Sequence, residues 1–435
     1  MRRRAIPLLP AAAALLGSSP AAAAGAAAPQ QSMLLLLTVL AIIGAGYLLA
    51  HFVVARLQRR FLFVSGAEYL LLGVLLGASS GVLSDTTALA PVIAFGTGWI
   101  GLREGTRLRL SWLQGLPRWS ARVALVEAVV VGGGLTALSV PVLVSLTGTS
   151  AQEAWLPAAV IGCAAAASSN TATTLLRARY PHLATGTLDT LTHASRLSEA
   201  LSIFAFGVLL CFFHPAVDGA LAHPVPAEWV LLMLGLGVTL GGLFSLLVSS
   251  ESTENHRFMA LVGIICFATG AAFFLGLSAL TVNLVLGVVL AHTARGRDLS
   301  DTLGRTVAPV VMLLLLLAGV LWAPVPALQG VALAAAVVFG RLALKLLSGW
   351  LASAGTPLRA DFGRGTLAQG PVALCIALSY RLIFDGPVVD LVFTAILASV
   401  VLNELLASRV LKGLLVDAGE LRQDVALDGG AGGGS

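Results

Sequence analysis

Long apolar segments recur along almost the whole chain, and only short connectors separate them. A helix needs roughly 20 predominantly apolar residues to cross the hydrocarbon core of a bilayer. Hydrophobic residues make up 57% of the sequence and charged residues only 11%, a balance far from that of soluble domains. These features predict an all-α polytopic membrane protein.

Thirteen segments satisfy this requirement, so we expect about 13 transmembrane helices. In chain order they are 33–55, 67–83, 87–102, 122–147, 153–176, 188–213, 228–249, 256–276, 277–294, 306–323, 327–352, 363–384 and 388–411.

The positive charges of the connectors predict the orientation. If the first span starts outside, the connectors and tail on the inner side carry nineteen Lys and Arg residues, and the outer connectors carry only Arg381. Cytoplasmic loops of membrane proteins carry the excess of basic residues. We therefore expect a multi-pass protein of the cell inner (plasma) membrane, with the mature N-terminus outside and the C-terminus in the cytoplasm.

The two ends of the chain differ from its middle. A basic triplet, a short apolar run and many small residues predict a secretory signal peptide over 1–29, with an uncleaved extra helix as the alternative. Residues 30–412 form the predicted transmembrane domain. The last segment, 413–435, ends in glycines and predicts a short flexible cytoplasmic tail.

Two of the predicted spans make poor continuous helices. The fifth contains a polar run from Ser168 to Thr174, and the twelfth contains Gly370 followed by Pro371. Proline removes a backbone donor and clashes with the preceding turn, so it breaks or kinks a helix. Free backbone groups at membrane depth are tolerated only inside protein or beside a water-filled cavity. An ordinary kink and a small-residue packing face are the simpler interpretations of these two features.

The positions of the two broken spans favour the first interpretation. Spans 2–6 and 9–13 form two blocks of five, and the broken span is the fourth member of each. An offset of seven spans inverts the topology of the second block. Inverted repeats with interrupted helices in corresponding positions are typical of transporters with a site at mid-membrane. We therefore expect two inverted five-helix repeats with broken crossing helices.

Two charged residues, Glu199 and Arg341, each lie near the middle of a long apolar span. A charged side chain at the bilayer centre costs several kcal/mol unless it faces a partner or a wet cavity, so such residues mark ion pathways. Arg196 lies three residues before Glu199, however, and an i,i+3 ion pair on one helix face would give the acid a structural role instead.

From about residue 65 to 412 the chain resembles the monovalent cation/proton antiporter superfamily, in particular the bacterial sodium/proton and potassium/proton exchangers. The segment CAAAASSNTATTLL is similar to the first unwound crossing helix of that family, and LAQGPVALCIAL is similar to the second. LSEALSIFAFG resembles the helix that carries the transport carboxylate, and FGRLALKLL resembles the helix with a conserved basic residue. The order and spacing of these segments agree with the predicted topology.

The resemblance implies roles for individual residues. Glu199 matches the ion- and proton-binding carboxylate, although the family usually has aspartate there, and Ser198 matches its polar neighbour. Arg341 and Lys345, one turn apart, match the basic residues that balance charge in the core. The unwound crossing region is matched by Ser169, Asn170, Gln369 and Gly370. Ser198, Ser169 and Asn170 are expected to supply oxygen ligands for the ion beside Glu199.

Two alternatives stay open for the basic pair. Arg341 either neutralises Glu199 when no ion is bound or fixes a helix interface, and Lys345 either shares its face or extends toward the inner surface. The other polar residues of the spans predict lesser roles. Asn283, Asn403 and Glu404 are expected to join helices by hydrogen bonds, Glu127 to lie near the inner interface outside the ion path, and His193 to be structural or to tune a pH response.

The sequence predicts no enzyme activity, no cofactor, no metal site and no nucleic-acid partner, because no phosphate-binding, zinc-binding or hydrolase motif is present and the four cysteines are scattered. The expected function is exchange of protons for Na⁺ or K⁺ by alternating access within a lipid bilayer. A sodium-coupled symporter of an organic anion on the same scaffold and a non-transporting scaffold or sensor are the alternatives. The resemblance also implies a homodimer.

Overall fold

The computed structural model describes residues 66–79, 89–180, 186–214, 225–250, 254–294 and 296–421. The predicted first span, 33–55, and the predicted signal peptide, 1–29, lie outside the described residues. The helices of the described residues coincide with the other twelve predicted spans, so the all-α fold is confirmed.

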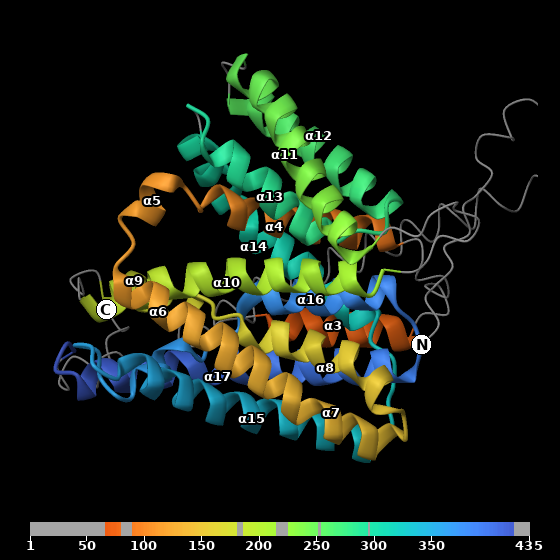
Figure 1. Ribbon diagram of the computed structural model, residues 1–435, viewed down its shortest axis with the longest axis vertical. Coiled ribbons are helices and arrows are strands. Elements are labelled where there is room, and N and C mark those ends of the chain that lie inside the picture. The colour runs from red at the N-terminus through yellow and green to blue at the C-terminus, as the bar shows by residue number, and fades with distance from the viewer. Residues whose placement is uncertain are drawn as a thin grey trace, which may run out of the picture.

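One group of helices, called the panel here, lies at the top of Figure 1 except for α3, which is lower in that view and joins the group through α14. Helices α4 and α13 make its tightest contact, α14 packs on α3 and α4, and α11 and α12 cover α13. The panel consists of α3 (Ala67–Ser79), α4 (Ala90–Thr106), α11 (Pro226–Ser250), α12 (Glu254–Phe274), α13 (Ala279–Ala291) and α14 (Gly296–Val320).

The second group, called the core domain here, fills the lower part of Figure 1, and a short helix α5 (Leu110–Gln114) leads into it from the panel. Its helices are α6 (Arg118–Glu127), η4 (Ala128–Gly133), α7 (Gly134–Thr147), α8 (Ala151–Ala166), α9 (Thr171–Arg179), α10 (Gly186–Phe212), α15 (Ala327–Ser353), η5 (Phe362–Thr366), α16 (Gly370–Ile383) and α17 (Pro387–Asp417).

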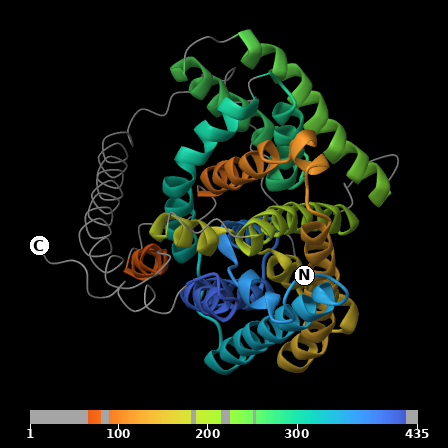
Figure 2. The same ribbon diagram turned by 90° about the vertical axis from the view of Figure 1, so that its left-hand side faces the viewer.

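Two helices of the core domain, α10 and α16, meet the panel. They contact α4 and α13, while α10 also touches α11 and α16 also touches α14. In Figure 2, α10 lies between the panel and the rest of the core domain. The largest cluster of buried apolar side chains runs through α16 and reaches α4 and α14. The contact of α10 and α16 with the panel is called the boundary here.

Glycines allow the closest helix contact of the panel. A Cβ atom at Gly105 of α4 would overlap the carbonyl oxygen of Leu284 of α13, and one at Gly287 would overlap the carbonyl oxygen of Leu102. Small residues let helix backbones approach closely in membranes, where dispersion contacts and hydrogen bonds drive association. The panel is therefore held by backbone-to-backbone packing.

Seven helical segments of the described residues are long and apolar enough to cross a membrane, by length and composition. Helices α3, α12, α13 and α16 contain shorter apolar segments. Together they make the chain a multi-pass membrane protein, as predicted.

The helix from Arg118 to Thr147 contains a π-helical segment, η4, directly after Glu127. A π segment holds one more residue than an α turn and is frequent at functional sites. Glu127, Val131 and Leu135 are buried, and this stretch packs on α8 and α15.

Several predicted boundaries shift. The largest shift is at the tenth span, which was expected to start at 306, whereas α14 begins at Gly296. The third span was expected to end at 102, but α4 continues to Thr106, because Glu104 is buried there between two arginines of the same helix end. The flexible tail was expected from 413, but α17 continues to Asp417 with Leu414 and Leu415 buried. The extensions of α4 and α17 are stabilised by tertiary contacts that hydropathy along the chain does not register.

Candidate functional site

The two predicted breaks are present, and they meet. Helix α8 ends at Ala166 and α9 begins at Thr171, while residues 367–369 separate η5 from α16. The backbone N–H of Ser169 donates to the carbonyl of Ala368 at 2.8 Å. The two non-helical segments therefore cross in direct contact, which gives four helix ends inside the core domain.

Gly370 makes this crossing possible. Its φ of 54° lies in the left-handed region, and a Cβ atom there would overlap the side chain of Ser169. Only glycine adopts this conformation without steric cost. The following Pro371 begins α16, where its missing N–H costs nothing.

Arg341 of α15 satisfies the carbonyl ends of the crossing. Its side chain is fully buried and donates to the carbonyls of Ala165 at 2.9 Å, Ala167 at 3.1 Å and Leu367 at 2.7 Å. The C-terminal end of a helix carries partial negative charge and leaves carbonyls unpaired, so a cation stabilises it. Arg341 thus joins the first broken helix to the second.

Lys345, one turn further along α15, forms a buried ion pair. Its Nζ lies 3.2 Å from Oε2 of Glu127, and it also donates to Ser168 Oγ and to the carbonyl of Ala166 at 3.2 Å. Ser168 Oγ in turn donates to Glu127 Oε2 at 2.8 Å. Both charged side chains are within 1% of complete burial. The side chains of Glu127, Lys345 and Ser168 thus join the helix that contains η4, helix α15 and the first break.

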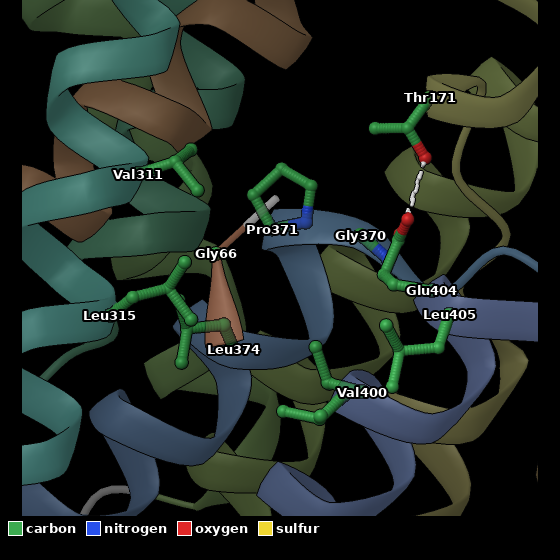
Figure 3. Close-up of a pocket in the computed structure, with 11 residues that line it drawn as sticks. Gly66, Thr171, Val311, Leu315, Gly370, Pro371, Leu374, Val400, Glu404 and Leu405 are labelled. Atoms are coloured by element: carbon green, nitrogen blue, oxygen red, sulfur yellow. Dashed lines mark hydrogen bonds between the residues drawn. The ribbon is translucent and has the colours of Figure 1, made fainter. Parts of the chain in front are cut away.

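Glu404 of α17 faces the opposite, N-terminal ends of the crossing. Oε1 accepts a hydrogen bond from the backbone N–H of Gly370 at 2.7 Å, and Oε2 accepts one from Thr171 Oγ1 at 3.1 Å. A carboxylate near a helix N-terminus is stabilised by the helix dipole and the free N–H groups. Figure 3 shows Glu404 and Thr171 at one end of an apolar pocket of about 80 Å³ that Pro371 also lines.

Gln369, in the second break, is held rigidly. Its Nε2 donates to the carbonyl of Ala164 at 3.1 Å, and its Oε1 accepts from Ser399 Oγ at 2.7 Å and from Asn403 Nδ2 at 3.2 Å. Asn403 thus makes the helix-joining hydrogen bonds expected of it. Asn170 in the first break is half-buried, and its backbone carbonyl accepts from the hydroxyls of two threonines of α9.

Glu199 lies in the middle of α10, beside the crossing and at the boundary with the panel. The neighbouring Ser198 donates to the carbonyl of Ala166 at 2.8 Å, the same carbonyl that Lys345 contacts. Glu199 itself is 1% exposed. One turn of α10 thus fixes the acid against the first broken helix.

Three buried oxygen atoms on the face of α10 that carries Glu199 have no hydrogen-bond partner among the described residues. They are Glu199 Oε2, Ser195 Oγ and Ser202 Oγ. Positions 195, 199 and 202 are spaced by four and three residues, so they share one face of α10. Unpaired buried polar groups are costly and call for an explanation such as a bound ion or water. A hard cation on Glu199 would supply a partner for its carboxylate and for one of the two hydroxyls. Ser195 and Ser202 are seven residues, about 10 Å, apart along the helix, so they do not reach a single ion together.

The panel brings further charges to this face of α10. Nη1 of Arg107 lies 3.7 Å from Glu199 Oε2 and 2.8 Å from Glu104 Oε2. Arg103 pairs with the other carboxylate oxygen of Glu104. The cluster contains two carboxylates and, with Arg196 on α10, three guanidinium groups.

These contacts correct two of the pairings considered from the sequence. Arg341 bonds backbone carbonyls and does not contact Glu199, so it fixes an interface. Arg196 lies beyond ion-pair distance of Glu199 in the part of the chain that the structure describes. Arg107 is the arginine within ion-pair distance of Glu199. Lys345 is buried against Glu127 and does not extend toward a surface.

Sequence reasoning missed Glu127 and Glu104 as parts of the charged framework. Glu127 was expected near the inner interface, and it is buried beside the crossing instead. Glu404 joins α17 to both breaks by hydrogen bonds, as expected of it. Asn283 bonds Thr269 and the carbonyl of Ala279, as a helix-joining residue should. His193 is half-buried and stacks on a tryptophan of α5.

The fold of the chain resembles that of a solved transporter structure. The sodium/proton antiporter MjNhaP1 from Methanocaldococcus jannaschii, in its structure at pH 8, superposes with a TM-score of 0.61 over 88% of this chain and 99% of that one. The sequences are 14% identical, so the likeness establishes a shared fold. The predicted resemblance to cation/proton antiporters is confirmed at that level. No protein-family model and no curated protein matches the sequence.

Proposed function

We propose that this chain, which has the fold of a sodium/proton antiporter, is a secondary active transporter that exchanges protons for Na⁺ or K⁺ across the membrane. The observation that carries the proposal is the buried carboxylate of Glu199, with unpaired oxygens of Ser195 and Ser202 on the same helix face. It lies at the boundary between the panel and the core domain, where an alternating-access site belongs.

The chemistry requires only one carboxylate. An ionised carboxylate binds either a proton or a cation, and a bound cation excludes the proton. Alkali cations are hard ions that take several oxygen ligands, by the same logic as other hard cations. Glu199 supplies charge, and the hydroxyl of Ser195 or that of Ser202 supplies a neutral oxygen. Competition for this site couples the two fluxes.

The core domain is suited to move as a unit. Arg341 and Lys345 satisfy the carbonyl ends of the crossing, and Glu404 satisfies the N–H ends. Because these charges are satisfied within the core domain, the crossing keeps its shape while α10 and α16 slide past the panel. This rigid-body movement would expose Glu199 to each side of the membrane in turn.

The membrane, the orientation and the oligomeric state in this proposal are taken from the sequence. The positive charge of the connectors supports insertion in the inner membrane with the mature N-terminus outside, and the resemblance supports a homodimer. A reporter enzyme that works only in the cytoplasm should be active when it is fused after Gly413. Activity of a periplasmic reporter fused at the same position would contradict the proposed orientation.

The decisive test replaces Glu199 by glutamine in protein reconstituted into vesicles. Glu199→Gln keeps the volume of the side chain but neither releases a proton nor balances a cation. We expect a loss of Na⁺- or K⁺-driven proton flux, measured with a pH-sensitive dye, to the level of empty vesicles. Thermal unfolding in detergent should show a folded variant of nearly wild-type stability, because Oε2 has no hydrogen bond to lose and Arg107 keeps its pairing with Glu104.

The control is Glu228→Gln, which removes a carboxylate from an exposed position at the start of α11. It should transport normally. Normal flux in a stable Glu199→Gln protein would contradict the proposal. A wild-type protein with no cation-driven proton flux at all would favour the organic-anion symporter or the non-transporting scaffold.

A further inference from the structure

Arg107 and Glu199 form an ion pair that crosses the boundary between the two helix groups. Arg107 directly follows α4 of the panel, and Glu199 lies in α10 of the core domain. Their closest side-chain atoms are 3.7 Å apart, with Arg107 10% and Glu199 1% exposed. Any sliding of the core domain against the panel must break this contact.

The panel holds Arg107 in place independently of Glu199. Nη1 of Arg107 donates to Glu104 Oε2 at 2.8 Å, and Arg103 takes the other oxygen of the same carboxylate. Two cations and one anion leave this end of α4 with one excess positive charge. That charge lies 3.7 Å from Oε2 of Glu199, a buried oxygen that has no hydrogen-bond donor among the described residues.

We propose that Arg107 is an internal cation that locks the core domain to the panel whenever Glu199 is ionised and carries no ion. The proposal rests on exchange at Glu199, as argued above. A proton or an alkali cation on Glu199 neutralises the carboxylate and removes its attraction for Arg107. The lock then opens, and the loaded core domain is free to move.

This arrangement supplies what an exchanger needs in addition to a shared site. If an empty, ionised carrier changed sides, protons would be carried one way and the carrier would return empty, which is a leak. Arg107 opposes that one step, because only the empty carboxylate attracts it. The other charged groups near Glu199 do not span the boundary in the same way: Arg196 is on α10 itself, and Arg103 pairs with Glu104.

The test measures coupling in vesicles free of Na⁺ and K⁺, with an imposed pH gradient and choline as the only salt cation. The wild type should show little proton flux until Na⁺ or K⁺ is added. Arg107→Gln should show cation-independent proton flux raised roughly tenfold, which corresponds to about 1.4 kcal/mol in the barrier of the empty carrier. Its apparent KM for the cation should fall, because an internal competitor is gone. Flux without cation that stays at the wild-type level would overturn the proposal.

A double variant and a matched arginine give the controls. Arg107→Gln combined with Glu199→Gln should abolish the leak, and a leak that persists would overturn the proposal because it bypasses Glu199. Arg103→Gln removes an equal charge from the same helix end but leaves the boundary contact, so its leak should be clearly smaller. If Glu199→Gln alone keeps full exchange, the proposed function fails first. If it is inactive and Arg107→Gln stays tightly coupled, only the lock fails.

A second measurement needs no change at Arg107. Hydrogen exchange of wild-type protein should become faster in residues 107–109 when saturating Na⁺ or K⁺ displaces the arginine. The Glu199→Gln protein should not respond to the cation. Unchanged exchange in the wild type, at a cation concentration that drives proton flux, would overturn the proposal even if the arginine variants do not fold.

Discussion

The crossing of the broken helices and the boundary around Glu199 are adjacent, yet they treat polar groups in opposite ways. At the crossing, Arg341 makes three hydrogen bonds to carbonyls, Lys345 pairs with Glu127, and Glu404 accepts two hydrogen bonds. Of these groups at the crossing only Glu127 has an oxygen without a hydrogen bond among the described residues, Oε1, whereas on the face of α10 Glu199 Oε2 and two serine hydroxyls all lack one. Both regions exclude water to a similar degree, so burial alone does not distinguish a framework from a site.

The difference shows which charges hold the fold together and which are available for exchange. Breaking a buried charge pair is expensive because it leaves one charge uncompensated. A group that binds a transported ion must instead be incomplete until the ion arrives. We therefore expect variants at the crossing to lose stability, and variants on the face of α10 to lose ion affinity.

The largest effect on stability should come from Lys345→Met. It leaves the Glu127 carboxylate buried without its cation, which should lower the free energy of unfolding by roughly 3–5 kcal/mol. Thermal or denaturant unfolding in detergent measures this change. Lys345→Met combined with Glu127→Gln removes both charges and should recover much of the loss. A single variant as stable as the wild type would show that the crossing does not depend on this pair.

An intermediate effect, on affinity and not on stability, should come from Ser195→Ala or Ser202→Ala. One of the two removes an oxygen ligand of the proposed cation site, and its apparent KM should rise roughly fivefold, equivalent to about 1 kcal/mol. The other serine lies about two helical turns further along α10 and should leave the KM nearly unchanged. The melting temperature should not fall, because neither hydroxyl has a hydrogen bond to lose. Cation-dependent proton flux in vesicles gives the KM.

The matched control for the serines is Ser408→Ala. Ser408 of α17 is also fully buried and its hydroxyl also lacks a partner among the described residues, but it lies in another helix, beyond the face of α10. Its removal should leave the KM unchanged. Equal KM shifts in all three serine variants would remove the distinction between the α10 face and other unpaired positions.

The smallest effect should come from Asp361, in the connector between α15 and η5. Hydrogen bonds from Arg359 at 2.9 Å and Arg364 at 3.1 Å hold the pKa of this carboxyl below its ordinary value, the former being the larger cause. A lowered pKa stabilises the folded state above the pKa of the unfolded chain, about 3.9, and the contribution is lost as pH falls through the folded value.

Asp361→Asn should therefore cost less than about 1 kcal/mol at neutral pH, as is usual for pairs near the surface. Unfolding curves at pH 7 and at pH 3 should differ less for the variant than for the wild type. A variant whose loss of stability matches that of Lys345→Met would contradict the separation of buried and peripheral charges.

The sequence was sufficient to locate the helices, the two breaks and the acid of α10. Apolar length alone places a span, and Gly370 with Pro371 breaks a helix wherever it lies. Charge partners are different, because they are set by packing between distant segments. Lys345 and Glu127 are more than 200 residues apart, so no local spacing indicates that they pair.

The same limit explains the missed contact at the panel. Arg103 and Arg107 were read as connector charges that set the topology, although one belongs to α4 and the other faces the candidate site. A basic residue at a helix end looks the same in sequence whether it faces the cytoplasm or a neighbouring carboxylate. Only the position of α10 relative to α4 distinguishes the two.

The π-helical segment η4 sets the rotational phase of the long helix that contains it. Buried residues along this helix recur every fourth position, from Glu127 through Val131, Leu135 and Ser139 to Leu143. At about 100° per residue, sixteen residues of regular α-helix would turn the last of them about 160° away from the first. The extra residue in the π turn takes back about 100° of that rotation. Because of this one inserted residue, the buried side chains stay on one side of the helix along its whole length. Glu127 faces Lys345 at one end, and apolar side chains face α8 at the other.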